Sequence, residues 1–382
     1  MEQLNIVGKR SGQGFVVHKA TLVNALSRAL AERVTLMDFS IGRKGLLGYT
    51  KALSGSNIVK IVPDSGSASD KQASEKRLKV TCGNNTSYLE DTAWIGEKTP
   101  MTLCEVRVSP ANTVTPNIGN TEFADAIDSV LPFTAHEDNK PNLHCVLFEA
   151  KEGKLTLTSA DGYRLATISL DCPGEGQAMI NRDSLRGIAN ALRKARRVNI
   201  SFEKGEETLD GMRLVIDTDR IRYKWDTEAG TFPEYKKLIP TEHKSAAHFD
   251  SVEALKALAA LKVVADSKAY PIDLHLNGGL EMSCADDKSV ATIPAETEGE
   301  EVTIRVDGAY LQQALRACGG MLILKINEPS KPMLFEAEGL QVVTIPMFRN
   351  AEAKVEAEVE AEKAEAVAEA EAVVKAEKPK RS

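Results

Sequence analysis

Two stretches of this chain are weakly similar to each other, and this internal repeat limits the possible folds more than any other feature. The copies occupy residues 153–167 and 278–292. Each begins with alternating apolar residues, passes through an Ala-Asp turn and ends on Ala-Thr without a gap, a pattern that predicts two strands joined by a turn. A second pair of segments, 180–189 and 306–315, recurs at nearly the same distance. The chain is therefore predicted to contain two similar units of about 125 residues each.

Each unit is predicted to have an α+β architecture. Helices with apolar residues three and four positions apart are expected at 121–131 and 251–261, and the second pair of segments adds another helix to each unit. Alternating strands follow, for example at 213–217 and 221–225. Two helices packed on several mostly antiparallel strands form a layered α+β domain.

The N-terminal region is expected to form a divergent third copy. A strand and a helix are predicted over 15–26 and a second helix near 42–53, but fewer strands fit here than in the later units. The polar stretch 64–77 is predicted to be a mobile loop. The resulting division comprises domain 1 at 1–120, domain 2 at 121–243, domain 3 at 244–350, and an Ala-, Glu- and Lys-rich tail at 351–382 that is helical or disordered.

Residue content argues against several classes of function. The six cysteines are scattered without a Cys-x-x-Cys pair, and the six histidines lack the His-Glu-x-x-His spacing of zinc hydrolases, so no metal site and no cofactor are expected. No nucleophile is paired with a base in a recognisable motif, so we do not expect an enzyme. The sequence has no start resembling a signal peptide and no apolar run of membrane-spanning length, from which we expect a cytoplasmic protein without a membrane partner.

Basic residues on the predicted helices indicate a polyanionic partner. If residues 182–197 form one helix, four of its arginines fall on a single stripe. The basic residues that would face such a partner are Arg182, Arg186, Arg193, Lys194, Arg197, Lys19 and Arg28. Because no side chains resemble base-edge readers, a nucleic acid would be bound through its phosphates without sequence specificity. The alternative is a solvated basic face, since the net charge is −7 and the predicted helix at 121–131 is acidic.

Three short motifs stand in a fixed order in the second half of the chain. They are Ala-Asp-Gly-Tyr-Arg-Leu-Ala at 160–166, Phe-Pro-Glu-Tyr at 232–235 and Val-Thr-Ile-Pro-Met at 343–347. Together with the internal repeat, they resemble the bacterial DNA polymerase III β subunit, the sliding clamp family. The resemblance covers residues 121–349 well and 15–120 loosely.

The resemblance implies both a fold and a function. The chain would have the DNA clamp (processivity) fold, in which three similar domains, each with two helices packed on antiparallel sheets, dimerise head to tail into a ring. The ring would encircle double-stranded DNA without sequence specificity and, without being catalytic, tether the catalytic subunit of DNA polymerase III. A clamp loader complex would open it, and other polymerases and repair proteins would bind through short hydrophobic peptides. The alternative is a monomeric clamp relative that binds such peptides without encircling DNA.

Carried over position by position, the resemblance also implies two binding surfaces. Partner peptides would enter a cleft between domains 2 and 3 that comprises Ala160, Gly162, Tyr163, Arg164, Leu165, Pro233, Lys237, Leu238, Val343, Ile345, Pro346 and Met347. The dimer contact would involve Val263 and Val264, in a turn and strand of domain 3, and Tyr88 and Leu89 of domain 1. Tyr163 departs from the family pattern, in which histidine is common at this position. The second copy of the repeat lacks the Gly-Tyr-Arg-Leu of the first, so the shared fold does not require those four residues.

Overall fold

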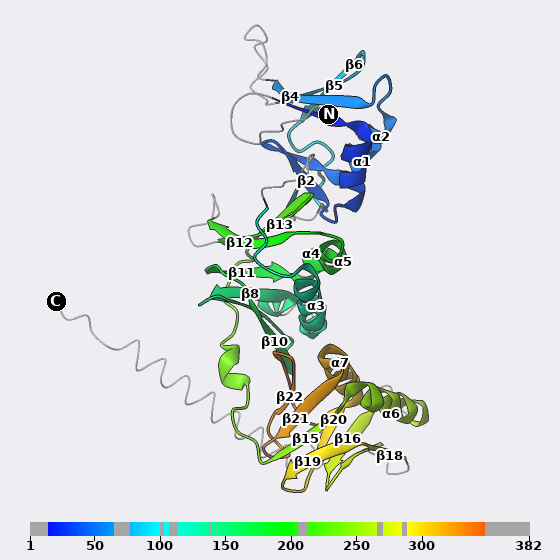
Figure 1. Ribbon diagram of the computed structural model, residues 1–382, viewed down its shortest axis with the longest axis vertical. Helices are drawn as coiled ribbons and strands as arrows, with labels where there is room; N and C mark the ends of the chain where they lie inside the picture. The colour runs from blue at the N-terminus through cyan, green and yellow to red at the C-terminus, as the bar shows by residue number, and fades with distance from the viewer. Residues whose placement is uncertain are drawn as a thin grey trace, which may run out of the picture. The chain divides into compact units, whose positions relative to one another are not determined.

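The computed structural model describes residues 14–64, 77–99, 103–106, 114–136, 140–204, 212–265, 270–284 and 289–347, which Figure 1 draws as ribbons. These residues divide into two compact units. Unit 1 contains the described residues of Met1–Asp161 and Thr167–Phe232, and unit 2 contains Gly162–Ala166 and the described residues of Pro233–Ser382. Five residues from the middle of the chain thus pack with its C-terminal part. The tail at 351–382 and most of the predicted loop at 64–77 lie outside the described residues.

The first part of unit 1 has two helices and two groups of strands. The predicted N-terminal strand and helix and the second helix are confirmed, and α1 and α2 pack on each other. Four antiparallel strands form a sheet in the order β1-β4-β5-β6. The elements are β1 (Phe15–His18), α1 (Lys19–Arg28), β2 (Arg33–Leu36), β3 (Phe39–Gly42), α2 (Arg43–Ala52), β4 (Ile58–Asp64), β5 (Arg77–Cys82), β6 (Asn85–Glu90) and β7 (Leu103–Val106).

The second part of unit 1 is joined to the first by a shared sheet. Its order is β12-β13-β14-β7-β2-β3, with β2 and β7 parallel. The first copy of the repeat forms β9 and the beginning of β10, as predicted, and helix α3 packs on α5. The elements are α3 (Asn120–Val130), η1 (Leu131–Phe133), η2 (Pro141–His144), β8 (Cys145–Lys151), β9 (Lys154–Ala160), β10 (Arg164–Asp171), β11 (Gly176–Asn181), α4 (Arg182–Leu185), α5 (Ile188–Arg193), β12 (Val198–Lys204), β13 (Met212–Thr218) and β14 (Ile221–Asp226).

The basic segment at 182–197 is not one helix, so that prediction is wrong. After α4, Arg186 has a ψ of 126° and Gly187 has a φ of 80°, and only then does α5 begin. A φ of 80° lies in the left-handed region, which glycine occupies at little steric cost. The chain changes direction at Gly187, and the arginines on either side of it therefore do not share the stripe expected of an unbroken helix.

Unit 2 consists mainly of two antiparallel groups of strands and two helices. The strand orders are β18-β17-β16-β20 and β23-β22-β21-β15-β19. Helices α6 and α7 pack on each other, and each begins at an aspartate, Asp250 or Asp307, whose side chain accepts a hydrogen bond from a backbone N–H of the first turn. The predicted helix at 306–315 is thereby confirmed, whereas the Ala-Asp turn of the second repeat lies outside the described residues.

The elements of unit 2 follow an order similar to that of the second part of unit 1: a helix, a run of strands, a further helical segment and three strands. They are η3 (Tyr235–Leu238), β15 (Ser245–Asp250), α6 (Ser251–Val264), β16 (Pro271–Leu276), β17 (Leu280–Cys284), β18 (Val290–Ile293), β19 (Ala295–Gly299), β20 (Val302–Asp307), α7 (Gly308–Cys318), β21 (Met321–Ile326), β22 (Met333–Ala337) and β23 (Leu340–Thr344).

Two glycines allow Trp94 to pack against the beginning of α2. A Cβ at Gly45 would lie 2.1 Å from the Trp94 ring, and a Cβ at Gly42 would lie 2.1 Å from the Trp94 carbonyl oxygen. Trp94 is about half exposed, whereas the other tryptophan, Trp225 on β14, is buried and stacks on Tyr223 with ring centroids 5.7 Å apart. The two indole rings therefore lie in very different surroundings.

Candidate functional site

The turn between β9 and β10 places one aromatic side chain in solvent and the next two side chains in the core. Gly162 has a φ of 96°, as expected from the Ala-Asp-Gly turn, because glycine takes this conformation most readily. Tyr163 is 60% exposed, whereas Arg164 and Leu165 are buried. These four residues all belong to unit 2, so Tyr163 is a surface residue held by buried neighbours on its C-terminal side.

The three residues that follow β23, here called the C-terminal strap (345–347), are tied to this turn through the backbone. The N–H of Ile345 donates to the carbonyl of Tyr163 at 3.0 Å, and the N–H of Met347 donates to the carbonyl of Arg305 at 2.7 Å. The Ile345 side chain is 42% exposed and that of Met347 39%, while the proline between them is buried. The strap thus holds two exposed apolar side chains in fixed positions beside Tyr163.

Helix α7 contributes the aromatic ring of Tyr310 to the same site. The guanidinium carbon of Arg164 lies 4.1 Å from the centroid of the Tyr310 ring, in the geometry of a cation–π contact. Arg164 also donates through Nη1 to Oε1 of Gln313. The rings of Tyr163 and Tyr310 have centroids 6.4 Å apart. Sequence reasoning did not assign Tyr310 or Gln313 to the site, because the contact joins segments 149 residues apart.

A buried ion pair fixes the strand beneath the C-terminal strap. Asp273 on β16 is 4% exposed and accepts hydrogen bonds from Nε and Nη2 of Arg305 on β20, at 2.8 and 2.9 Å. A bidentate pair of this kind restricts the orientation of both side chains. Because the carbonyl of Arg305 also accepts the N–H of Met347, the ion pair supports the position of the strap.

The segment at 233–240 leads from the Phe-Pro-Glu-Tyr motif toward β15. It contains one turn of 3-10 helix, η3. Within it, Leu238 is 57% exposed, and Lys237 forms an ion pair of 2.5 Å with a glutamate three residues before it. Both residues line a cavity of about 360 Å³ together with residues of the loop between β21 and β22. Pro233, which precedes η3, is exposed.

The exposed side chains of the predicted cleft offer mainly apolar contacts. The exposed large apolar members of the predicted cleft are Tyr163, Leu238, Ile345 and Met347, whereas Leu165 and Val343 are buried. Ala160, the last residue of β9, belongs to unit 1. In the described part of the chain, no group of three or more His, Cys, Asp or Glu could hold a metal ion. None of the helices described is both long and apolar enough to cross a membrane.

Known proteins resemble the chain in sequence. The chain is 26% identical over 222 residues to the β sliding clamp of Streptomyces coelicolor, a match that spans 56% of this chain and 58% of that protein. It is 23% identical over 272 residues to the β sliding clamp homolog GriR of Streptomyces muensis, with 68% of each chain covered. The chain thus spans less than two thirds of the length of the first relative. No family model matches it.

Solved structures resemble the chain over most of its length. The sliding clamp of Pseudomonas aeruginosa superposes with a TM-score of 0.60 at 18% identity, covering 88% of this chain and 99% of that one. The clamp of Bacillus subtilis gives 0.61 at 15% identity, covering 89% and 100%. This chain has the sliding-clamp fold. The resemblance to the DNA polymerase III β subunit expected from the three motifs is confirmed.

Within the clamp fold of unit 1, Arg182 is buried, so its prediction as a DNA-facing residue is wrong. Its Nη1 donates to the carbonyl oxygens of Thr134 at 3.3 Å and Ala135 at 3.1 Å, and lies 2.8 Å from Nδ1 of His136. Burial lowers the pKa of Arg182. This guanidinium group therefore bonds to the segment after η1 and is not exposed at the surface.

Arg193 is at the surface, but two carboxylates of the neighbouring helix α3 hold it. Its Nη2 lies 2.6 Å from Oδ1 of Asp125 and 2.8 Å from Oδ2 of Asp128, and these hydrogen bonds raise the pKa of Arg193. Arg186 is more exposed and lies 3.3 Å from Asp183. The carboxylates partly neutralise these two arginines, which therefore contribute a weaker positive electrostatic potential than two unpaired arginines would.

The other basic residues that were predicted to face DNA do not lie on a single stripe. Lys19 donates its ammonium to the carbonyl of Leu53 at the end of α2, and Nη1 of Arg197 lies 3.5 Å from the carbonyl of Val114. Arg28 and Lys194 are exposed at the ends of α1 and α5. Among the described residues, the side chains of these last two make no hydrogen bond or ion pair, so their charges are available to a partner.

The residues predicted to form the dimer contact lie on an edge strand of unit 1 and at the end of a helix of unit 2. Tyr88 is half exposed on β6, an edge strand of its sheet, but Leu89 faces the core at 6% exposure because successive strand residues point to opposite sides. Val263 and Val264 are 85% and 57% exposed and end helix α6, so the predicted turn and strand at this point are wrong. Val290, on the edge strand β18 beside α6, is also exposed and was not predicted.

Proposed function

We propose that this chain is a sliding clamp, a non-catalytic subunit that encircles duplex DNA in the cytoplasm and tethers the catalytic subunit of DNA polymerase III. The observation that carries the proposal is the exposed apolar cluster formed by Tyr163, Ile345 and Met347 on the clamp fold. Other polymerases, repair proteins and a clamp loader complex would use the same cluster. The predicted domains at 1–120, 121–243 and 244–350 would supply the three similar parts of each ring half.

The cluster suits a short hydrophobic peptide. Exposed apolar side chains that lie together on a soluble surface commonly mark an interaction site. Here the backbone hydrogen bonds of the strap and the stacking of Arg164 on Tyr310 hold that surface in place before a partner arrives, which lowers the entropy cost of binding. A solved clamp of Pseudomonas aeruginosa, 17% identical with a TM-score of 0.59, is bound to griselimycin, and a ligand site on this fold supports the proposal.

Ring closure would use two strand edges. β6 carries the exposed Tyr88 in unit 1, and β18 carries the exposed Val290 beside the exposed end of α6 in unit 2. An edge strand has unpaired backbone groups that can extend a sheet across two chains. A head-to-tail contact joins unlike surfaces and closes into a ring when the rotation permits. Tyr88, Val263, Val264 and Val290 are the residues that we assign to this contact.

Duplex DNA would be held by scattered cations, not by a basic stripe. Arg28, Lys194 and Arg197 are the exposed residues that we assign to this role, with Arg186 and Arg193 weakened by their carboxylate partners. Few phosphate contacts give weak, strongly salt-dependent binding without sequence preference. Such binding is compatible with a protein that stays on DNA by encircling it.

The test is the retention of the protein on DNA of different topology. Protein loaded by a clamp loader complex onto nicked circular DNA should remain bound through gel filtration in high salt, and linearising the circle should release it. Sedimentation equilibrium at micromolar concentration should give twice the mass of the chain. A monomer that binds a polymerase-derived peptide would refute the ring and leave a peptide-binding clamp relative.

A further inference from the structure

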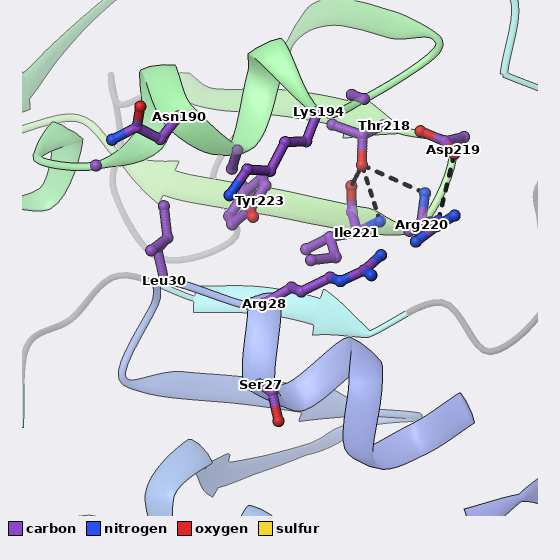
Figure 2. A pocket seen from close by; sticks show the side chains of 13 residues that line it. Ser27, Arg28, Leu30, Asn190, Lys194, Thr218, Asp219, Arg220, Ile221 and Tyr223 are labelled. Carbon is purple, nitrogen blue, oxygen red and sulfur yellow. Dashed lines mark hydrogen bonds and ion pairs between the residues drawn. The ribbon is translucent and has the colours of Figure 1, made fainter. Parts of the chain in front are cut away.

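A second site lies in unit 1, away from the apolar cluster. A cavity of about 240 Å³ opens between the C-terminal ends of α1 and α5, next to the hairpin that joins β13 and β14 (Figure 2). Its apolar lining includes Leu30, Ala191 and Ile221. This volume lies just below the usual range for ligand pockets, so it suits a group no larger than one nucleotide and not an internal polymer segment.

Three cations line the cavity, and they come from three different elements. Arg28 ends α1, Lys194 follows α5, and Arg220 lies in the turn of the hairpin. The helix dipole makes a cation favourable at each helix end, but it does not account for the third cation. In Figure 2 the guanidinium groups of Arg28 and Arg220 are drawn at the same end of the cavity.

The formal charge of the lining is close to +2. Its only carboxylate is Asp219, whose Oδ1 accepts the backbone N–H of Arg196 at 3.1 Å and whose Oδ2 lies 3.6 Å from Nε of Arg220. The side chains of Arg28 and Lys194 have no hydrogen-bond or ion-pair partner among the described residues. An anion that entered here would therefore find two cations not already neutralised.

A buried hydroxyl also lacks a partner. Tyr223 lines the cavity and is 1% exposed, and no described residue hydrogen-bonds to its hydroxyl. Leaving such a group unsatisfied destabilises the fold, so phenylalanine would be more favourable at this position if packing were its only role. Burial raises the pKa of Tyr223, so the group remains a proton donor at neutral pH.

The hairpin that carries Arg220 is fixed before a ligand arrives. The Thr218 hydroxyl donates to the carbonyl of Ile221 at 2.7 Å and accepts the N–H groups of Ile221 and Arg220 at 2.9 and 3.3 Å. The bond from Arg196 to Asp219 ties the same turn to the segment after α5. A preordered donor set binds an anion at a lower entropy cost than a mobile one.

We propose that this cavity binds a phosphate monoester of mononucleotide size. A monoester carries a charge of about −1.5 to −2 at neutral pH, which matches the lining, whereas an internal phosphodiester of DNA carries one negative charge. Arg28 and Arg220 would hold the phosphate oxygens with their planar donor sets, Tyr223 would donate a hydrogen bond, and Leu30 and Ile221 would contact the organic part. The monoester could be a free nucleotide or the 5′-phosphate at the end of a strand. The proposal does not depend on the function proposed above.

The test is calorimetric titration of the full chain with thymidine 5′-monophosphate and with thymidine. The monophosphate should bind, and the nucleoside should bind at least about tenfold more weakly, because a hydrogen bond to a charged group contributes about 1.5–3 kcal/mol. Arg28→Gln and Lys194→Gln should each weaken the monophosphate by roughly tenfold. The matched control is Lys151→Gln, which changes an exposed lysine of the same unit outside the cavity and should have no effect.

Tyr223→Phe separates binding from stability. It should weaken the monophosphate by roughly fivefold to tenfold without lowering the melting temperature of the free protein, because the hydroxyl has no partner within the protein. Single-stranded oligonucleotides with a 5′-phosphate or a 5′-hydroxyl distinguish the two sources: preference for the phosphorylated strand over the free nucleotide assigns the site to strand ends, and the reverse assigns it to free nucleotides. Thymidine binding as tightly as the monophosphate, or monophosphate binding that Arg28→Gln and Tyr223→Phe leave unchanged, would overturn the proposal.

Discussion

Replacing Met347 with lysine tests the peptide site most directly. Met347 is 39% exposed, and burying a whole methionine side chain is worth about 1.5–3 kcal/mol. Covering the exposed fraction with a peptide therefore contributes about 0.6–1.2 kcal/mol, which the substitution removes. Desolvating the new ammonium adds about 1–3 kcal/mol. The expected loss is about 2–4 kcal/mol, or roughly 30- to 700-fold in Kd.

The assay is fluorescence anisotropy of a labelled hydrophobic peptide from a polymerase. The matched control is Met321→Lys, because Met321 is also an exposed methionine of unit 2, 66% exposed at the start of β21. Circular dichroism and thermal melting should match the parent for both variants. Leu165 is less suitable for this experiment, since it is 3% exposed and a lysine there would unfold the site. Parental affinity in Met347→Lys, or an equal loss in Met321→Lys, would refute the reasoning.

Three further outcomes are expected from the described contacts. Asp128→Asn should strengthen duplex binding at low salt by roughly twofold to fivefold, because it frees part of the charge of Arg193; an anisotropy titration that shows weaker binding would contradict this. Gly187→Ala should destabilise the fold by about 1–2 kcal/mol because its φ is 80°, whereas Gly48→Ala, in open space on α2, should be neutral or stabilising in urea unfolding. Burial alone would raise the pKa of Glu336, but hydrogen bonds from a lysine and a glutamine lower it. This carboxylate therefore contributes stability above about pH 4.3 that is lost as pH falls through its lowered pKa, and Glu336→Gln should show a shallower acid-side loss in melting temperature.

The local elements could be predicted from the sequence because their signals are local. The alternating apolar residues of the repeat predicted β9 and the beginning of β10, and the recurring segment at 306–315 predicted α7. Gly162 was correctly expected at a turn, since its positive φ is a property of the residue itself.

The errors arose where distant contacts or a single glycine decided the outcome. The charge pattern at 182–197 fitted a helical wheel, yet Gly187 broke the helix, and its presence was the one available signal. Arg182 turned inward to carbonyl groups 47 and 48 residues away, and no periodicity reveals such contacts. Tyr310 was missed because its place in the peptide site also depends on distant contacts, with Arg164 and Tyr163 of another segment.

The contrasting surroundings of the two tryptophans provide built-in optical reporters for unit 1. Trp94 lies half in water against the glycines of α2, so its emission should be red-shifted, whereas the buried Trp225 should emit at shorter wavelength and be quenched less by iodide. A variant with only Trp94 would report on the packing of α2. A variant with only Trp225, stacked on the tyrosine that lines the cationic cavity, would report ligand entry there as a change in intensity.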